Sequence, residues 1–312
     1  MDRDLSLTEL TPDLLPAVVD LCRAALDLPG DAVEAERIVA RLRETGPVPG
    51  AAGPRRTTGW VAVSGSSVIG VVLGSTGYRD PAVGHVDLIA VDPAHRRRGV
   101  GRALLARIES ALAGLGAGEV LLAGNPPIYA WPGIDVRYTP AICAALATGY
   151  EQHATAWNMT ADLTPGSLAL APTGPAEARL ASVGVTVRRA GPEDVAALTA
   201  FARGHFDAGW SAEITHSVGR PGAGCHLAER DGEILGFAAY GSSRPSWFGP
   251  MGTAPAARGL GVGGVLLRRC LQDQHASGLT SAEIGWVGPV PFYSANAGAR
   301  IERVFFLYRK QL

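Results

Sequence analysis

The sequence predicts an α/β fold in two tandem units, each a mixed, mostly antiparallel sheet flanked by helices. Two observations predict this fold. The pattern Arg-x-x-Gly-x-Gly occurs at Arg96–Gly101 and again at Arg258–Gly263, and each copy runs into an apolar helical stretch. Upstream of each copy, residues 60–74 and 226–241 alternate apolar and polar side chains around a glycine-containing turn, as a β-hairpin does. Because these elements recur in the same order, we interpret the chain as a duplication.

Each unit begins with a predicted helix. Residues 10–21 and 189–201 both place proline and an acidic residue before an apolar helical period, which is typical of a helix start. In the first unit, residues 85–91 are predicted as the strand before the loop, and residues 99–112 as the helix after it. The predicted order in each unit is therefore helix, hairpin, strand, loop, helix, strand, helix and strand.

A segment rich in proline and glycine and poor in charge separates the two copies at residues 163–175. Such a composition is typical of a connection between domains. We therefore predict an N-terminal domain at residues 1–163, a linker at 164–184 and a C-terminal domain at 185–312.

The composition limits the classes of function. The 312 residues are 47% hydrophobic, enough for two buried cores, and the net charge of -1 argues against a nucleic-acid partner. The four cysteines form no Cys-x-x-Cys spacing, so we expect no metal site. No apolar run approaches the ~18 residues of a membrane-spanning helix, so we expect no membrane partner and a cytoplasmic location. The abundance of alanine, glycine and arginine favours a bacterial source.

The arginine-glycine loop suits a phosphate group. Gly99 and Gly101 let the backbone turn sharply and expose its N–H groups at the start of a helix. The free N–H groups and the positive end of the helix dipole attract an anion, and the arginines add charge-assisted hydrogen bonds. The spacing differs from that of the nucleoside triphosphatase loop and from the dinucleotide-binding fingerprint.

The repeated loop resembles that of the GCN5-related N-acetyltransferase (GNAT) family, and the resemblance covers nearly the whole chain as two tandem copies. In that family the loop holds the pyrophosphate of acetyl-CoA, and the pantetheine arm pairs with the end of a bulged, splayed strand that precedes the loop. The resemblance implies that acetyl-CoA is the cofactor. In the first unit it implies contacts from the strand end and loop: Ile89, Ala90, Val91, Arg96, Arg97, Arg98, Gly99, Val100, Gly101 and Arg102. In the second unit it implies Met251, Gly252, Thr253, Arg258, Gly259, Leu260, Gly261, Val262, Gly263 and Gly264.

The resemblance also implies a general acid. The last helix of the family often begins Phe-Tyr and ends in glycine, which Phe292, Tyr293 and Gly298 match. Tyr293 is therefore predicted to protonate the departing thiolate. The same position in the first unit falls near Ala144 or Ala145, which cannot donate a proton. We therefore expect the C-terminal domain to be catalytic and the N-terminal domain to be non-catalytic or degenerate.

The general base is less well determined by the sequence. Glu283, on the strand after the cofactor helix of the second unit, is the candidate nearest the expected thioester. Asp207, Glu213 and His216 lie in the segment that would cover the acceptor, and a backbone carbonyl or a water could also relay the proton.

The first unit carries an insertion, Asn125–Tyr138, that the second unit lacks. Its aromatic residues, with Asp135 and Arg137 in a proline-glycine loop, suit a wall facing the substrate, an interdomain contact or a rigid surface loop. The sequence leaves these alternatives open.

The acceptor is expected to be a primary amine of a small molecule. The C-terminal stretches at residues 285–293 and 303–310 are similar to those of the glucosamine/glucosaminide N-acetyltransferase group, which would imply an amino sugar; an aminated natural product is a related possibility. The alternatives are a protein or peptide N-acetyltransferase and a non-catalytic acetyl-CoA-binding regulatory protein. A monomer and a homodimer both fit a tandem chain.

Overall fold

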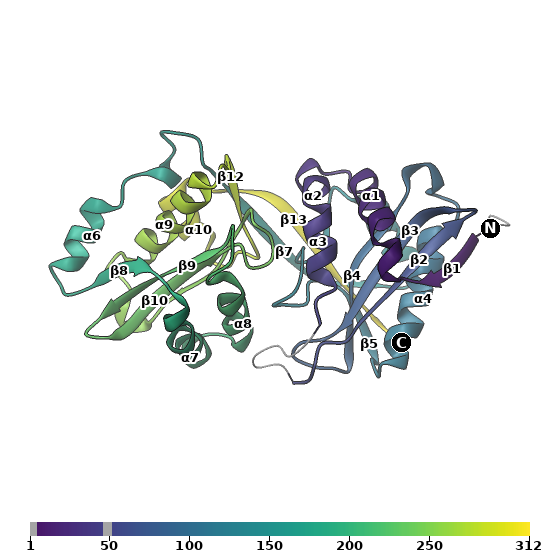
Figure 1. Ribbon diagram of the computed structural model, residues 1–312, viewed down its shortest axis with the longest axis horizontal. Coiled ribbons are helices and arrows are strands. Elements are labelled where there is room, and N and C mark those ends of the chain that lie inside the picture. Colours follow the sequence, from purple (N-terminus) through teal and green to yellow (C-terminus); the bar gives the residue numbers. More distant parts are fainter. Residues whose placement is uncertain (1–4, 46–51) are drawn as a thin grey trace. The chain divides into compact units, whose positions relative to one another are not determined.

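A computed structural model describes residues 5–45 and 52–312, and it divides the chain into two compact units (Figure 1). Unit 1 comprises Met1–Ala156 and Phe305–Leu312, and unit 2 comprises Trp157–Val304. Each unit is an α/β structure with a mixed sheet, so the predicted fold class is confirmed. Within the described ranges, no helix is long and apolar enough to cross a membrane.

Unit 1 contains the predicted elements in the predicted order, but a strand at residues 5–9 precedes the first helix and two further helices follow it, none of which was predicted. Its helices are α1 (Leu15–Ala25), α2 (Pro29–Val33), α3 (Ala35–Leu42), α4 (Val100–Gly114) and α5 (Thr139–Ala147), with 3₁₀ turns at Pro12–Leu14 and Pro93–His95. Its strands are β1 (Leu5–Glu9), β2 (Thr57–Ser64), β3 (Ser67–Thr76), β4 (Val83–Val91), β5 (Glu119–Leu122), β6 (Ile134–Asp135) and the end of β13 (Arg300–Gln311). The sheet order is β1-β2-β3-β4-β5-β13, and β6 pairs with β13. Only the β4–β5 pair among these is parallel.

Helices cover both faces of the unit 1 sheet. Because alternate residues of a strand point to opposite faces, neighbouring residues pack against different helices. On β3, Val71 and Leu73 pack in one buried cluster with α1 and α3, including Val18 and Ile38. The intervening Val72 packs on the other face, in the cluster that contains α4. The sheet of unit 1 therefore has a buried core on each face.

Unit 2 repeats this plan. Its helices are α6 (Gly174–Ala181), α7 (Val195–His205), α8 (Ala208–Ser217), α9 (Val262–Ala276) and α10 (Val290–Ala297), with 3₁₀ turns at Leu168–Leu170, Pro192–Asp194 and Pro255–Ala257. Its strands are the end of β7 (Glu151–Asp162), β8 (Thr186–Arg189), β9 (Gly224–Arg230), β10 (Glu233–Tyr240), β11 (Trp247–Thr253) and β12 (Ser281–Ile284), in the order β7-β12-β11-β10-β9-β8. Phe237 packs with α7 and α8, whereas Ala238 packs with α9 on the opposite face.

The last strand of each half of the sequence completes the other unit. The end of β13 pairs with β5 of unit 1, with Tyr308 opposite Leu122. The end of β7 pairs with β12 of unit 2, with Asp162 opposite Ser281. The domain boundaries therefore differ from those expected from the sequence: residues 157–163 belong to unit 2 and residues 305–312 to unit 1. The sequence repeat did not reveal this exchange, because a strand reads the same whichever sheet it joins.

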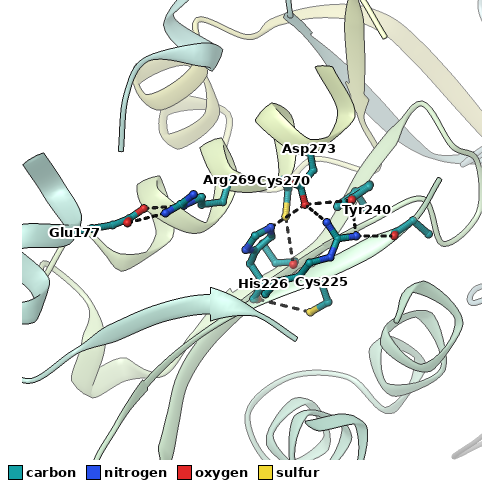
Figure 2. Close-up of polar contacts among 10 residues, drawn as sticks. Glu177, Cys225, His226, Tyr240, Arg269, Cys270 and Asp273 are labelled. Atoms are coloured by element: carbon teal, nitrogen blue, oxygen red, sulfur yellow. Dashed lines mark hydrogen bonds and ion pairs between the residues drawn. The ribbon is translucent and has the colours of Figure 1, made fainter. Parts of the chain in front are cut away.

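The segment predicted as a linker, residues 164–184, has secondary structure and buried side chains. It contains the 3₁₀ turn Leu168–Leu170 and α6, and Ala169 and Leu180 are buried in the unit 2 core. Figure 2 shows Glu177 of α6 meeting Arg269 of α9, with two hydrogen bonds of 2.7 Å. This segment is therefore an integral part of unit 2.

A polar cluster joins strands of unit 2 to α9. Asp273 Oδ2 accepts hydrogen bonds from His226 Nε2 at 2.9 Å and Tyr240 Oη at 3.2 Å (Figure 2), and from Arg189 Nη1 at 2.7 Å. Desolvation alone would raise the pKa of Asp273, but the His226 hydrogen bond, the charges of His226 and Arg189 and the Tyr240 hydrogen bond together lower it. The carboxylate therefore stabilises unit 2 in its charged form.

The exchanged strand yields a test of unit 1. Tyr308 is 1% exposed, so Tyr308→Ala should lower the stability of unit 1 by about 3–5 kcal/mol through the lost burial and the cavity left behind. Ile301→Ala, on the same strand but in unit 2 and 46% exposed, should change stability by less than about 0.5 kcal/mol. Hydrogen exchange of amides in β5 and α4 would measure the effect. Faster exchange in unit 2 alone after Tyr308→Ala would contradict the strand exchange.

The Asp273 cluster yields a test of unit 2. Asp273→Asn should destabilise unit 2 by about 1–3 kcal/mol near neutral pH, because it removes the charge that three donors share. A depressed pKa contributes stability above the ordinary value of 3.8, and this contribution is lost as the pH falls through the folded-state pKa. The difference from wild type should therefore shrink below about pH 4.

Hydrogen exchange of the unit 2 amides at several pH values would measure this difference. Glu233→Gln, at an exposed position at the start of β10, is the matched control and should have little effect. A difference that is unchanged at low pH would contradict the role of the carboxylate charge.

Candidate functional site

The arginine-glycine loop of unit 1 ends at the start of α4. Gly99 is the N-cap of this 15-residue helix and has a φ of 88°, a conformation that favours glycine. The N–H groups of the first helical turn have no partners within the helix, and they carry the positive end of its dipole. A Cβ at Gly101 would meet only a Val91 methyl at 3.8 Å, so there is open space beside this turn. The loop is therefore shaped to receive an anion.

The arginines of this loop have different contacts. Arg96 donates to Ala25 O at 2.9 Å and to both oxygens of Asp27, so it fastens the loop to the end of α1. Arg97 and Arg102 line a cavity beside the loop, and Arg98 is exposed. The side chain of Val100 packs in the core, so only its backbone could reach a ligand.

The two parallel strands before and after α4 part from each other. β4 pairs with β5 from Val83–Glu119 to His85–Leu121, and the described register ends there. On the other side of β4, Leu73 faces Leu88 and Gly74 faces Val86, which leaves Asp87 as a bulged residue without an opposite partner. The bulge and the splay expected of the strand before the loop are therefore both present in unit 1.

A cavity of about 840 Å³ occupies this opening in unit 1. It runs along β4 from Val86 to Val91 and reaches Arg97 and Gly99 of the loop. The predicted contact residues that line it are Ile89, Ala90, Val91, Arg96, Arg97, Gly99, Gly101 and Arg102. These residues lie together along one cavity, and their contacts with a cofactor stay a prediction.

The insertion Asn125–Tyr138 supplies the added wall. Tyr129, Trp131 and Tyr138 line the cavity, together with Asp135 and the small residues between them. Of the alternatives that the sequence left open, a wall facing the ligand is the one that this geometry supports.

Sequence reasoning missed the buried polar groups behind the bulge. The Asp87 side chain is 1% exposed and binds Arg55 at 3.0 Å, while Arg55 also donates to two backbone carbonyls at the end of α3. Burial raises the pKa of Asp87 to about 6, although Arg55 and Ser75 oppose this effect. Because its side chain is covered, Asp87 faces the cavity through its backbone. The sequence signal was an acid within a strand that is apolar apart from Asp87 and His85.

His85 lies next to this pair, at the point where the strands part. Its Nδ1 is 3.0 Å from Ala123 O, so Nδ1 carries the proton and donates to this carbonyl. Burial lowers the pKa of His85 to about 4, so the ring is neutral at physiological pH. The hydrogen bond ties β4 to the residue that follows β5, just beyond the last strand pair.

In unit 2 the same loop occurs, but its surroundings are more tightly packed. Gly261 caps α9 with a φ of 87°, and Arg258, Gly259 and Leu260 are exposed. β11 pairs with β12 at Trp247–Glu283 and Phe248–Ile284, so these strands also part toward the loop.

Several predicted contact residues of unit 2 have packing partners instead of open space. A Cβ at Gly263 would lie 3.3 Å from the Phe292 ring, and one at Gly264 would lie 2.5 Å from Asn296 Oδ1. At Gly252 it would overlap the Phe206 ring. Val262 is buried, whereas Met251 and Thr253 are half-buried. Gly263 and Gly264 therefore lie where α10 packs closely against α9, at the Phe292 and Asn296 side chains.

Tyr293 lies in α10, five residues before Gly298, which has a φ of 63°. It is 7% exposed, and its ring meets those of Phe248 and Phe292 at centroid distances of 6.1 and 5.1 Å. Burial raises the pKa of Tyr293, so its hydroxyl stays protonated, as a proton donor requires. In unit 1, Ala144 lines the cavity five residues before Gly149, which has a φ of 86°.

The candidates for the base in unit 2 have structural contacts. Glu283 accepts a hydrogen bond from Asn158 Nδ2 and lies 3.5 Å from Arg303 Nη1, while Asn158 Oδ1 accepts from the Trp286 N–H at 2.7 Å. Asp207 caps α8 by accepting from the Gly209 N–H at 2.7 Å. The contacts of Glu283 among the described residues do not include Tyr293. The roles of Glu283 as base and of Tyr293 as acid therefore stay predictions.

The chain matches the Acetyltransferase (GNAT) family over residues 32–129 and 195–288, more than half of its length. The chain belongs to this family, with one match in each unit. No curated protein matches it significantly.

Solved structures show the same fold at low sequence identity. The GCN5-related glucosamine N-acetyltransferase region of a fungal multi-domain GH3 beta-N-acetylglucosaminidase is 17% identical with a TM-score of 0.75, over 98% of this chain and 38% of that one. The chain thus spans well under half the length of that protein. A tandem GNAT protein from the clavulanic acid biosynthesis pathway is 18% identical with a TM-score of 0.66, over 98% of both chains. A GNAT protein from Sphaerobacter thermophilus is 16% identical with a TM-score of 0.64, over 100% and 96%.

Gly101 offers a test of the cavity as an acetyl-CoA site. Gly101→Glu places a carboxylate where the diphosphate would bind, and it should weaken acetyl-CoA binding at least about ten-fold. Gly101→Ala should bind within about three-fold of wild type, because its Cβ makes an ordinary contact at 3.8 Å. Calorimetric titration would measure both affinities. Equal binding by Gly101→Glu and wild type would contradict the site.

Proposed function

We propose that the protein is an acetyl-CoA-dependent N-acetyltransferase whose acceptor is a primary amine of a small molecule. One observation carries this proposal: in unit 1, the anion-binding loop, the unpaired edge of β4 and an aromatic wall line a single cavity. The loop and the strand edge suit the cofactor, and the wall leaves space for an acceptor beside it.

The residues of unit 1 fit acetyl-CoA. The first-turn N–H groups of α4, with Arg97 and Arg102, would bind the diphosphate. The backbone of Val86–Val91, where β5 has parted from β4, would pair with the amide groups of the pantetheine arm. Acetyl-CoA supplies the activated thioester, the acceptor amine forms the new C–N bond, and the C–S bond breaks. The departing thiolate takes a proton, and the amine loses one.

The cavity supports unit 1 as the place of transfer, which differs from the expectation that the N-terminal domain is non-catalytic. Tyr129 and Tyr138 of the insertion line this cavity, and the helix position used by Tyr293 holds Ala144. Transfer in unit 2, with Tyr293 as acid and Glu283 as base, remains the second candidate. The buried, protonated hydroxyl of Tyr293 favours it.

The solved structures support a small-molecule acceptor only by analogy. One similar region is named a glucosamine N-acetyltransferase, and one similar protein comes from the clavulanic acid biosynthesis pathway. An amino sugar and an aminated natural product are therefore both reasonable acceptors. A soluble protein located in the cytoplasm, without a nucleic-acid partner, fits this proposal.

Two matched substitutions decide which unit is active. Gly99 and Gly261 are both helix N-caps with φ near 88°, and a Cβ at either would lie in open space. Gly99→Glu and Gly261→Glu therefore carry similar backbone strain and differ only in the loop that they block. We expect Gly99→Glu to reduce amine-dependent release of CoA thiol at least about 100-fold, and Gly261→Glu to stay within about three-fold of wild type.

The other outcomes separate the alternatives. Loss with Gly261→Glu alone, together with loss in Tyr293→Phe, would assign transfer to unit 2. A preference for lysine peptides over small amines would indicate a protein acetyltransferase. Acetyl-CoA binding without thiol release for any amine would contradict the enzymatic proposal and favour a regulatory protein.

A further inference from the structure

The insertion of unit 1 is built as a fixed wall. Asn125 Nδ2 donates to Ser75 Oγ and Thr76 O, both at 2.9 Å, and its Oδ1 accepts from the Tyr78 N–H at 3.0 Å. Asn125 is 2% exposed, so these bonds are shielded from water. They hold the first residue of the insertion against β3 and the segment that follows it.

The other parts of the insertion are also held in place. Strand β6 pairs with β13, with Asp135 opposite Phe305. At the last residue, the Tyr138 hydroxyl accepts from the Leu28 N–H at 3.3 Å and donates to Asp31 Oδ2 at 3.1 Å. Contacts at the start, middle and end give this wall a defined shape, which a specific site requires.

The surface of the wall is mainly apolar and aromatic. Tyr129, Ala130, Trp131 and Ile134 line the cavity, and Leu26 and Leu88, which belong to the buried cluster that contains Ala130, also line it. The Asp135 carboxylate in this wall is occupied, because both of its oxygens accept from Arg137, at 2.8 and 3.0 Å. The wall therefore offers ring faces and methyl groups, and its carboxylate already has a partner.

This chemistry discriminates between the two classes of acceptor. A sugar brings several hydroxyl groups, and each one buried without a hydrogen-bond partner weakens binding, because it gives up its hydrogen bonds to water. A ring or hydrocarbon body gains affinity when it is buried against aromatic faces. A protonated amine approaching such faces is also attracted by their π electrons.

We propose that Asn125–Tyr138 is the acceptor-recognition wall of unit 1, and that it selects a primary amine on an apolar, ring-containing body over an amino sugar. This inference rests on the proposed function and names the substrate class of the same cavity. Trp131 is the central specificity-determining residue, because it has the largest aromatic side chain among the residues of the insertion that line the cavity.

Calorimetry on the intact protein saturated with desulfo-CoA, which cannot react, tests this inference by binding alone. The probes are phenethylamine and glucosamine. We expect phenethylamine to bind at least about ten-fold more tightly than glucosamine, and Trp131→Leu to weaken phenethylamine at least about five-fold without changing the affinity for desulfo-CoA. Trp157→Leu, at a tryptophan of unit 2 that is 36% exposed, is the control and should bind like wild type.

Thermal unfolding of each variant confirms that it is folded, and Trp131→Phe, which retains an aromatic face, should restore most of the affinity. Tighter binding of glucosamine, no binding of phenethylamine, or equal binding by wild type and Trp131→Leu would overturn the inference and leave the proposed function standing. Failure of desulfo-CoA to bind would instead overturn the cofactor site on which both depend.

Discussion

The parting of β4 from β5 beyond the His85–Leu121 pair is the constraint on which the site of unit 1 depends. Two parallel strands that separate leave backbone N–H and C=O groups without partners, and such groups need a ligand, water or side chains. Two buried polar contacts fix β4 at this point. His85 hydrogen-bonds the Ala123 carbonyl, and Asp87 forms an ion pair with Arg55 behind the bulge. The same strand then leads into the loop and the start of α4. One local irregularity therefore places a strand edge, an anion site and an open cavity side by side.

The duplication has kept the loop in both units but not its surroundings. In unit 1, Ala144 and the aromatic residues of the insertion line the cavity beside the loop. In unit 2, Tyr293 fills the corresponding helix position and packs against Phe248, while Phe292 approaches Gly263. The exchange of β7 and β13 also means that neither half of the sequence contains a complete unit, so each half depends on the other for its last strand.

Local patterns made much of this predictable from the sequence. The hairpins, the strand before each loop and the helix after it could be predicted because apolar residues recur with a period of 2 in strands and of 3.6 in helices. The glycine at each helix start predicted a sharp turn, because glycine readily adopts a positive φ. The ends of β7 and β13 could not be placed, because pairing depends on distant strands. Nor could the roles of Gly263 and Gly264 be separated from those of Gly99 and Gly101: all lie in or directly after the same motif, yet Phe292 and Asn296 give the former pair a packing function. The Asp87–Arg55 pair escaped notice because its partners are far apart in the sequence.

A crystal structure of the intact protein grown with acetyl-CoA would test the central claim most directly. The account predicts the diphosphate at the N–H groups that follow Gly99, and the pantetheine arm along Val86–Val91, with its thioester near the backbone of Asp87. Acetyl-CoA bound only at the Gly261 loop of unit 2, with the unit 1 cavity closed or empty, would contradict it.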